Sequence, residues 1–275
     1  MNMRVTILGS AAAEGWPGMW CCCDACQEAR RRGGVNIRRR TAYLIDGDTL
    51  VDCGPDIYWQ SVSFGIDLAQ IRRIFFTHSH YDHLAPRELS WRRKGYSIYA
   101  GPVLDIFGNE AVRERILAEL SCPPETASLA LHPVEPGKSV QSGDIVAMPV
   151  RANHAPDEIP VNYVLQRGGK NILIGNDTGW WAEESWELVR QFKLDAAILE
   201  CTYGHLDPDA TAHHLGVDAM VRMRDRLADE GTLKPGARVV ANHFSHNGMT
   251  LHEELCAYLL PHGIGVGYDG MILDL

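Results

Sequence analysis

The sequence predicts a layered α/β fold in which β-sheets are covered by helices. Three observations predict it. The 275-residue chain is long enough to bury a large core. Short apolar runs separated by turns recur along its length, and helical stretches lie between them. Hairpins in the first half with interleaved helices favour such layers. Because no internal repeat and no linker rich in Pro, Gly or Ser is present, we expect one domain over residues 1–275.

The individual elements follow from these runs in chain order. The first apolar run ends at Gly9 and is too short for a signal peptide, so we interpret it as a strand. The predicted strands are Arg4–Leu8, Thr41–Ile45, Thr49–Asp52, Arg73–Phe76, Ser97–Tyr99, Ile145–Val150, Val161–Gln166, Asn171–Ile174, Ala196–Glu200, Arg238–Ala241 and Gly265–Val266. The predicted helices are Asp24–Arg32, Pro86–Arg93, Glu110–Leu120, Ala182–Phe192, Thr211–Glu230 and Leu251–Leu260.

Composition and charge limit the classes of function. The formal net charge of −9 argues against a general nucleic-acid binder, which normally carries a basic surface. It does not exclude an anionic substrate, because bound divalent metals can invert the local field. No apolar run approaches the roughly 20 residues of a membrane span. We therefore expect a cytoplasmic protein with a small anionic substrate, no membrane association and no nucleic-acid partner, and we consider a homodimer as its assembly.

The strongest functional signal is the segment RRIFFTHSHYDHLAP. An apolar strand runs directly into six residues that hold three histidines and an aspartate. In an extended segment His78 and His80 project to the same side, so both can bind one metal. The following turn into a helix would aim Asp82 and His83 at a neighbouring position. Imidazole suits Zn, Fe, Ni and Cu, and carboxylate adds a preference for harder ions such as Mn.

Three further candidates share one structural context. His154, Asp177 (within GNDTG) and His243 each lie just past the expected end of an apolar strand. Ligands on loops at strand ends converge on one rim of a sheet. Alone, each could be a hydrogen-bonded structural residue. The repetition of the context favours a shared metal site.

The cysteines indicate a second metal site. Four of the eight lie in WCCCDACQEA, and in an intracellular enzyme such a cluster is more often metal-binding than disulfide-forming. Cys21, Cys23 and Cys26 form a C-x-C-x₂-C pattern that supplies three thiolates and leaves one tetrahedral position open. Cys22 would point away from them. The alternative is a reduced surface cluster without a metal.

The order of HSHYDH, His154, Asp177 and His243 resembles the metallo-β-lactamase superfamily. LVDCG at 50–54 is similar to that family's early strand-turn motif, in which Asp52 supports the site. The resemblance extends from residue 4 to about residue 246. It implies a four-layer αββα sandwich with two divalent metals, Zn or Mn, between the sheets. The implied ligands are His78, His80 and His154 for one metal, Asp82, His83 and His243 for the other, and Asp177 bridging both.

The cysteine cluster is similar to that of the phosphoribosyl cyclic phosphodiesterases of phosphonate breakdown. That group also pairs its last catalytic histidine with another three residues later, as NHFSHNG does here. The resemblance implies His246 as the fourth ligand of a structural zinc, in an N-terminal insertion near residues 20–27. It also implies an active-site histidine within TAHHLGVDAM, where His214 matches better than His213. Alternatively, both histidines merely occupy the start of a helix.

The leading hypothesis is a metal-dependent phosphodiesterase that cleaves a small, possibly cyclic phosphodiester. Two metals about 3.5–4 Å apart generate hydroxide at neutral pH and clamp the phosphodiester oxygens. Asp82, Asp177 and His214 are then the expected catalytic residues, with the histidine protonating the leaving group. One alternative is hydrolysis of a lactone, ester or thioester on the same centre. Another is a non-hydrolytic, iron-dependent protein similar to the pyrroloquinoline quinone synthesis proteins, whose motif is less complete.

Overall fold

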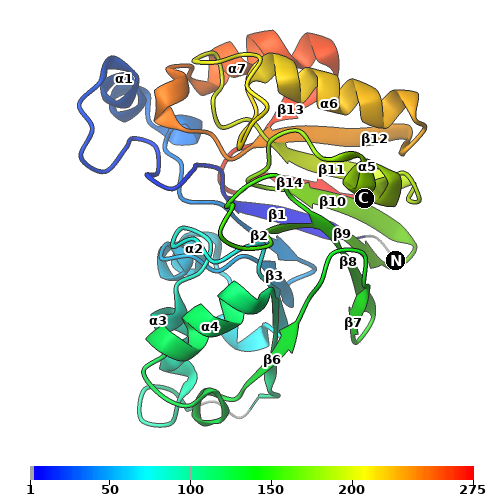
Figure 1. Cartoon of the computed structure of the whole chain (residues 1–275). Helices are drawn as coiled ribbons and strands as arrows, with labels where there is room; N and C mark the ends of the chain where they lie inside the picture. The colour runs from blue at the N-terminus through cyan, green and yellow to red at the C-terminus, as the bar shows by residue number, and fades with distance from the viewer. Residues whose placement is uncertain (1–2, 99–100) are drawn as a thin grey trace.

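The computed structural model describes residues 3–98 and 101–275, and these form two seven-stranded sheets packed face to face (Figure 1). The first sheet has the order β14 (Ile272–Asp274), β1 (Arg4–Gly9), β2 (Ala42–Ile45), β3 (Thr49–Val51), β4 (Arg73–Phe75), β5 (Leu104–Gly108) and β6 (Leu129–Pro133). The second has the order β13 (Ile264–Val266), β12 (Leu233–Asn242), β11 (Leu194–Glu200), β10 (Lys170–Gly175), β9 (Val161–Arg167), β8 (Ile145–Arg151) and β7 (Val140–Ser142).

Strand alternation explains why the sheets stack. In β10, Ile172 and Ile174 face the core between the sheets, whereas Leu173 between them joins the cluster on the outer face. Phe75 of the first sheet and Tyr163 of the second meet in the inner core, with ring centroids 5.5 Å apart. Strands that are apolar on both faces must be covered on both sides. Each sheet therefore needs an outer layer of helices.

Helices supply those outer layers (Figure 1). The second sheet is covered by α1 (Asp24–Arg32), α5 (Glu183–Val189), α6 (Val217–Asp229) and α7 (His252–Leu259). The first sheet is covered by α2 (Ile57–Phe64), α3 (Pro86–Leu89) and α4 (Glu110–Glu119). The predicted fold class, a four-layer αββα sandwich, is confirmed.

Strand direction brings the functional loops to one rim. Strands β3 to β6 pair in parallel, and so do β10 to β13. Strand β8 runs in the same direction as β10, because each pairs antiparallel with β9 between them. The carboxyl ends of these strands consequently open onto one edge of the sandwich, where α/β folds bind ligands.

Several predicted elements differ from the structure. Ser97–Tyr99 is not a strand: Ser97 forms only an isolated bridge with Lys94, Ile98 is fully exposed, and Tyr99 lies outside the described residues. Without burial, this short apolar stretch has no sheet to join. The predicted helix Pro86–Arg93 is one α-helical turn, α3, followed by a 3₁₀ turn at Ser90–Arg92. The elements β5, β6, β7, β14 and α2 were not predicted, and two of them, β7 and β14, have only three residues each.

Among the described residues, no helix combines the length and the apolar character that crossing a membrane requires.

Candidate metal centre and active-site cavity

Sharp backbone turns at the strand ends present the functional side chains. Asp52 follows β3, Asp177 follows β10 and His243 follows β12, and these residues adopt positive φ angles of 63°, 41° and 57°. Non-glycine residues seldom adopt this left-handed conformation, which costs on the order of 1–3 kcal/mol. The surrounding fold must therefore hold them there, and each turn directs its side chain inward over the rim.

His78, His80 and His154 meet as one group, with their ligand nitrogens within 4.8 Å of one another. His154 Nε2 lies 3.2 Å from His80 Nδ1. Glu158 fixes the loop between the first two, because its carboxylate accepts the backbone N–H and the hydroxyl of Ser79. This loop projects both histidines toward one point, as the two-residue spacing predicted.

Asp82, His83, Asp177 and His243 form an adjacent, fully buried group. His83 Nε2 lies 3.0 Å from Asp82 Oδ2. Asp177 extends between the groups: its Oδ2 is 2.5 Å from His83 Nε2 and 3.5 Å from His78 Nε2, and its Oδ1 is 3.1 Å from His243 Nε2. A carboxylate in this position can bridge two cations.

The hydrogen bonding of the histidines tests whether metals fit. Three rings use Nδ1 for a supporting contact, while their buried Nε2 atoms face the Asp177 carboxylate and, among the described residues, form no well-aligned hydrogen bond. The Nδ1 contacts are His78 with Thr77 Oγ1 (3.0 Å), His83 with Asp52 Oδ2 (2.7 Å) and His243 with Thr202 Oγ1 (2.9 Å). Metal-binding histidines characteristically pair their second nitrogen in this way. Because buried nitrogens and carboxylate oxygens that meet without well-aligned hydrogen bonds are costly, the arrangement fits cations bound at Nε2.

The buried negative charges of two carboxylates also indicate that cations fit this site. Burial would raise the pKa values of Asp82 and Asp177, but neighbouring imidazoles outweigh burial and hold both well below their ordinary range. Burial likewise opposes a charge on His83, yet the adjacent carboxylates raise its pKa well above the ordinary value. Removing one partner from such a charged cluster leaves an uncompensated charge. Divalent cations would complement these carboxylates directly.

Glu200, at the end of β11, organises a further histidine and was missed by the sequence analysis. Its buried carboxylate accepts hydrogen bonds from the backbone of Thr178, Thr202 and Leu215, at 2.8, 3.1 and 3.0 Å. It also accepts from His214 Nδ1 at 2.7 Å. An acidic residue closing the apolar strand LDAAILE was the one signal in the sequence that could have identified it.

The structure separates the two histidines of TAHHLG. The His214 ring lies beside the cluster, with Nδ1 3.6 Å from Asp177 Oδ1. The His213 side chain is exposed, and its carbonyl oxygen lies 3.2 Å from His154 Nδ1. Burial lowers the pKa of His214, but Glu200 above all, together with Asp177, outweighs burial and raises the pKa to about 9.

The predicted helix Thr211–Glu230 was wrong at its start, because α6 begins only at Val217. The preceding residues form a loop tied to the end of β11 by Leu215, which donates to Glu200 and accepts from Tyr203. Gly216 precedes the helix so closely against Asp207 that a Cβ there would lie 1.9 Å from the Asp207 carbonyl oxygen. His214 is thus a loop residue and not part of a helix.

The second predicted metal group is also assembled. The ligand atoms of Cys21, Cys23, Cys26 and His246 lie within 4.8 Å of one another, and Cys22 is exposed outside the group. His246 Nδ1 is 3.8 Å from Cys23 Sγ. Burial raises the pKa of the Cys26 thiol to about 12, so the thiolate would form there only together with a cation. Three thiolates and one imidazole match a closed tetrahedral zinc site.

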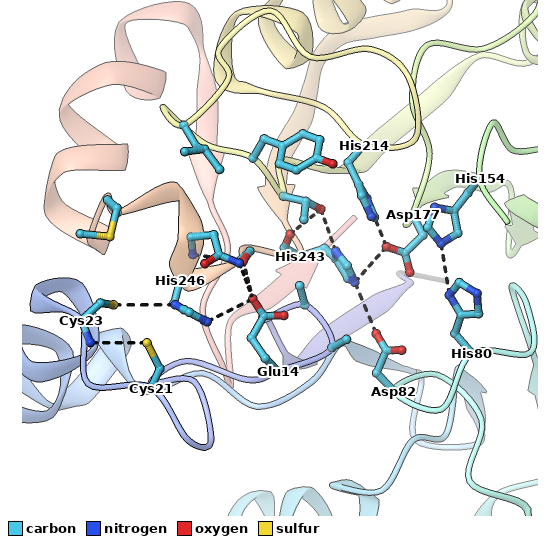
Figure 2. A pocket seen from close by; sticks show the side chains of 18 residues that line it. Glu14, Cys21, Cys23, His80, Asp82, His154, Asp177, His214, His243 and His246 are labelled. Atoms are coloured by element: carbon cyan, nitrogen blue, oxygen red, sulfur yellow. Dashed lines mark hydrogen bonds and ion pairs between the residues drawn. The ribbon is translucent and has the colours of Figure 1, made fainter.

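A cavity of about 650 Å³ extends from the His/Asp groups to the cysteine group. Figure 2 shows His80, Asp82, His154, Asp177, His214 and His243 at one end of it, and Cys21, Cys23 and His246 at the other. Glu14, from the loop after β1, lies between them. The cavity is large enough for a small-molecule substrate.

A family model described as the beta-lactamase superfamily domain matches residues 48–244. The chain belongs to the metallo-β-lactamase superfamily. The matched range contains Asp52 and every residue of the two His/Asp groups, so the fold and the expectation of bound divalent metals rest on the family as well as on the geometry. Membership of this superfamily supports the assignment of a metal-dependent hydrolase, without specifying the substrate.

Two kinds of curated protein are similar to this chain in sequence, an octanoyltransferase and PQQ synthesis proteins. The chain is 28% identical over 281 residues to an octanoyltransferase of Porphyromonas gingivalis, covering 98% of this chain and 51% of that protein. It is 29% identical over 308 residues to coenzyme PQQ synthesis protein B of Methylorubrum extorquens, covering 99% of this chain and all of that protein. The chain therefore spans only about half the length of the first relative.

Solved structures share the complete fold. A diphosphatase from the PhnP family matches with a TM-score of 0.78 and 25% identity, covering 100% of this chain and 98% of that one. Zinc-bound PqqB from Methylobacterium extorquens matches with a TM-score of 0.77 and 19% identity, over 99% and 100% of the two chains. Human tRNase Z, short form, matches with a TM-score of 0.62 and 21% identity, covering 98% of each chain.

Proposed function

We propose that the protein is a metal-dependent phosphodiesterase that hydrolyses a small phosphodiester. The observation that carries the proposal is the convergence of three buried histidine Nε2 atoms on the Asp177 carboxylate at one end of a cavity of substrate size. Likeness over the whole chain to a diphosphatase of the PhnP family supports phosphorus-centred chemistry.

The metal ligands divide into two sets that share one carboxylate. His78, His80 and His154 would hold one cation, Asp82, His83 and His243 the other, and Asp177 both. Zn and Mn suit this mixture of imidazole and carboxylate. When bound, the two cations polarise the phosphoryl oxygens and lower the pKa of a water molecule to near neutrality.

His214 supplies the proton for the leaving oxygen. Its Nδ1–H donates to Glu200, and this hydrogen bond fixes the orientation of the ring. The proton for the leaving oxygen is then the one on Nε2. With its pKa raised to about 9, the ring is protonated at neutral pH in the absence of cations, and each bound cation opposes this shift. A proton donor of this kind contributes about 10²–10⁴-fold to the rate.

Hydrolysis of bis(p-nitrophenyl) phosphate by the Zn- or Mn-reconstituted protein tests the proposal. We expect turnover by the natural sequence and a loss of more than about 100-fold in kcat for Asp177→Ala, because both cations lose a shared ligand. The matched control, Asp229→Ala, makes the same substitution at the far end of α6 and should retain turnover. Intact phosphodiesters beside rapid cleavage of lactones or thioesters would transfer the assignment to carboxylic ester hydrolysis.

The relatives named PQQ synthesis protein B favour a second candidate, a non-hydrolytic role in cofactor synthesis, because the similarity covers both chains completely. Iron content together with oxygen consumption would identify that candidate. Acyl transfer has weaker support, since about half of the octanoyltransferase has no counterpart in this chain.

A further inference from the structure

One wall of the cavity consists of residues that the proposed reaction does not use. We call these residues the Glu14 wall, because Glu14 lies between the cysteine group and the His/Asp groups (Figure 2). Its members are Glu14, Tyr203, Leu206, Asn247 and Met249. A substrate whose phosphodiester occupies the His/Asp groups would extend along this wall.

Neighbouring side chains hold the Glu14 carboxylate in place through one of its two oxygens. The Ser245 hydroxyl donates to Oε1, and His246 Nε2 and Asn247 Nδ2 each lie 3.5 Å from the same oxygen. Within the described residues no hydrogen bond is formed to Oε2. The side chain is 30% exposed. One oxygen of a fixed carboxylate is therefore available to a ligand in the cavity.

The zinc site contributes to this placement. His246 has Nδ1 on the side of Cys23 Sγ, at 3.8 Å, and Nε2 on the side of Glu14. A metal bound at Nδ1 leaves the ring proton on Nε2, which then donates toward the carboxylate. The structural metal site would thus fix the orientation of Glu14 as well as the loop around it.

The cavity lacks partners for a second anionic group. Of the described residues that line it, none is a lysine or an arginine, and all its histidines belong to the metal groups or to the His214 position. Arg40 does not line the cavity, and its guanidinium donates to the Ala13 carbonyl oxygen at 2.7 Å and pairs with Asp56 at 3.0 Å. Phosphate and carboxylate groups are normally bound by such cations. Here they would meet the charge of Glu14 instead.

We propose that Glu14 is a specificity-determining residue that binds the part of the substrate remote from the scissile bond, and that this part carries a hydroxyl or ammonium donor and no second anionic group. Leu206 and Met249, 59% and 51% exposed, add apolar contact at the outer edge of the wall. This inference rests on the proposed phosphodiesterase function.

Three p-nitrophenyl phosphodiesters that differ only in their second ester group test the proposal. The second group is choline (cationic), ethyl (neutral) or glycolate (anionic). We expect the lowest KM for the choline ester and the highest for the glycolate ester. Glu14→Gln should reduce the choline-to-glycolate ratio of kcat/KM by about three- to tenfold, mainly through KM, because one partly exposed charge is removed. Glu114→Gln, an equal charge change on α4, should leave the ratio unchanged.

Two outcomes would overturn the proposal: preference of the natural protein for the glycolate ester, or an equal effect of Glu14→Gln on all three substrates. The equal effect, accompanied by loss of zinc, would assign Glu14 to the metal site alone. If the protein cleaves none of the esters, the phosphodiesterase function fails separately. Calorimetric binding of choline phosphate and phosphoglycolate then decides the wall's preference by itself, with tighter binding of choline phosphate supporting it and tighter binding of phosphoglycolate rejecting it.

Discussion

Asp177 adopts a φ of 41° two residues after the end of β10, and from that position its carboxylate lies close to His78, His83 and His243. Asp52 and His243 show the same left-handed backbone at two other strand ends. This strained backbone at three site residues indicates that the fold holds their side chains in place before any ligand binds. Pre-placed ligands need little rearrangement when a cation arrives.

Glu200 is the residue whose effect on pH dependence can be predicted with a definite sign. The proton donor His214 must be protonated, so kcat should fall as the pH rises through its pKa. Glu200 raises that pKa, and Glu200→Gln removes the charge while keeping the size. The fall in kcat should therefore occur at lower pH in the variant, because the carboxylate that raises the pKa of His214 is lost, whereas bound cations act on both proteins alike.

Profiles of kcat between pH 6 and 10 measure this shift, and metal analysis checks that the variant still binds its cations. Glu187→Gln, on the outer surface of α5, is the control and should follow the natural profile. Superimposable profiles for Glu200→Gln and the natural protein would remove His214 from the role of proton donor.

At the scale of elements, the loop between β1 and α1 is folded around the cysteine group. Gly18 lies so close to this group that a Cβ would be 2.7 Å from the His246 ring and 3.1 Å from Cys21 Cβ. Only glycine permits this approach. The loop thus joins the N-terminal segment to the segment after β12, where His246 follows His243.

Gly18→Ala should displace the His246 ring and weaken the structural zinc site. We expect less than one equivalent of zinc after exhaustive dialysis, together with a loss of about 1–3 kcal/mol in the free energy of unfolding. Gly33→Ala is a suitable control, because its φ of 65° makes the substitution strained while no atom of the described residues lies within 4 Å of the new Cβ. That variant should be destabilised yet keep its zinc. Full zinc retention by Gly18→Ala would show that the loop can adjust.

At the scale of the whole molecule, the site joins the two halves of the sandwich. His78 and Asp82 follow β4 of the first sheet, whereas His154, Asp177 and His243 follow strands of the second. Cations held by both sets should cross-link the sheets. Such ligands bind the folded chain and stabilise it by mass action.

Chelation should accordingly lower the melting temperature. We expect EDTA to reduce Tm by on the order of 5–10 °C and added zinc to restore it. Asp177→Ala should show a smaller decrease, because its active-site cations are already weakened. Calorimetric scans with and without chelator measure both effects. An unchanged Tm in the natural protein would mean that the cations contribute nothing to the stability of the sandwich.

The sequence alone predicted the features that depend on the spacing of neighbouring residues. HSHYDH predicts ligands two residues apart on one strand end, and the apolar runs predict most strands of both sheets, because side-chain direction follows from strand periodicity. Sequence order also placed His154, Asp177 and His243 at strand ends. The structure brings these residues together in one place, and their role as metal ligands stays a prediction.

Tertiary structure decided what depends on contacts between distant segments. Strands as short as β7 and β14 exist because neighbours pair with them, which no local pattern reveals. The pairing of Glu200 with His214 in place of His213, and the position of Glu14 between two metal groups, arise from loops that meet only in the folded chain. The residues that could bind metals were recognisable from the sequence. The side chains that orient them and line the substrate cavity are brought into position only by packing between distant segments.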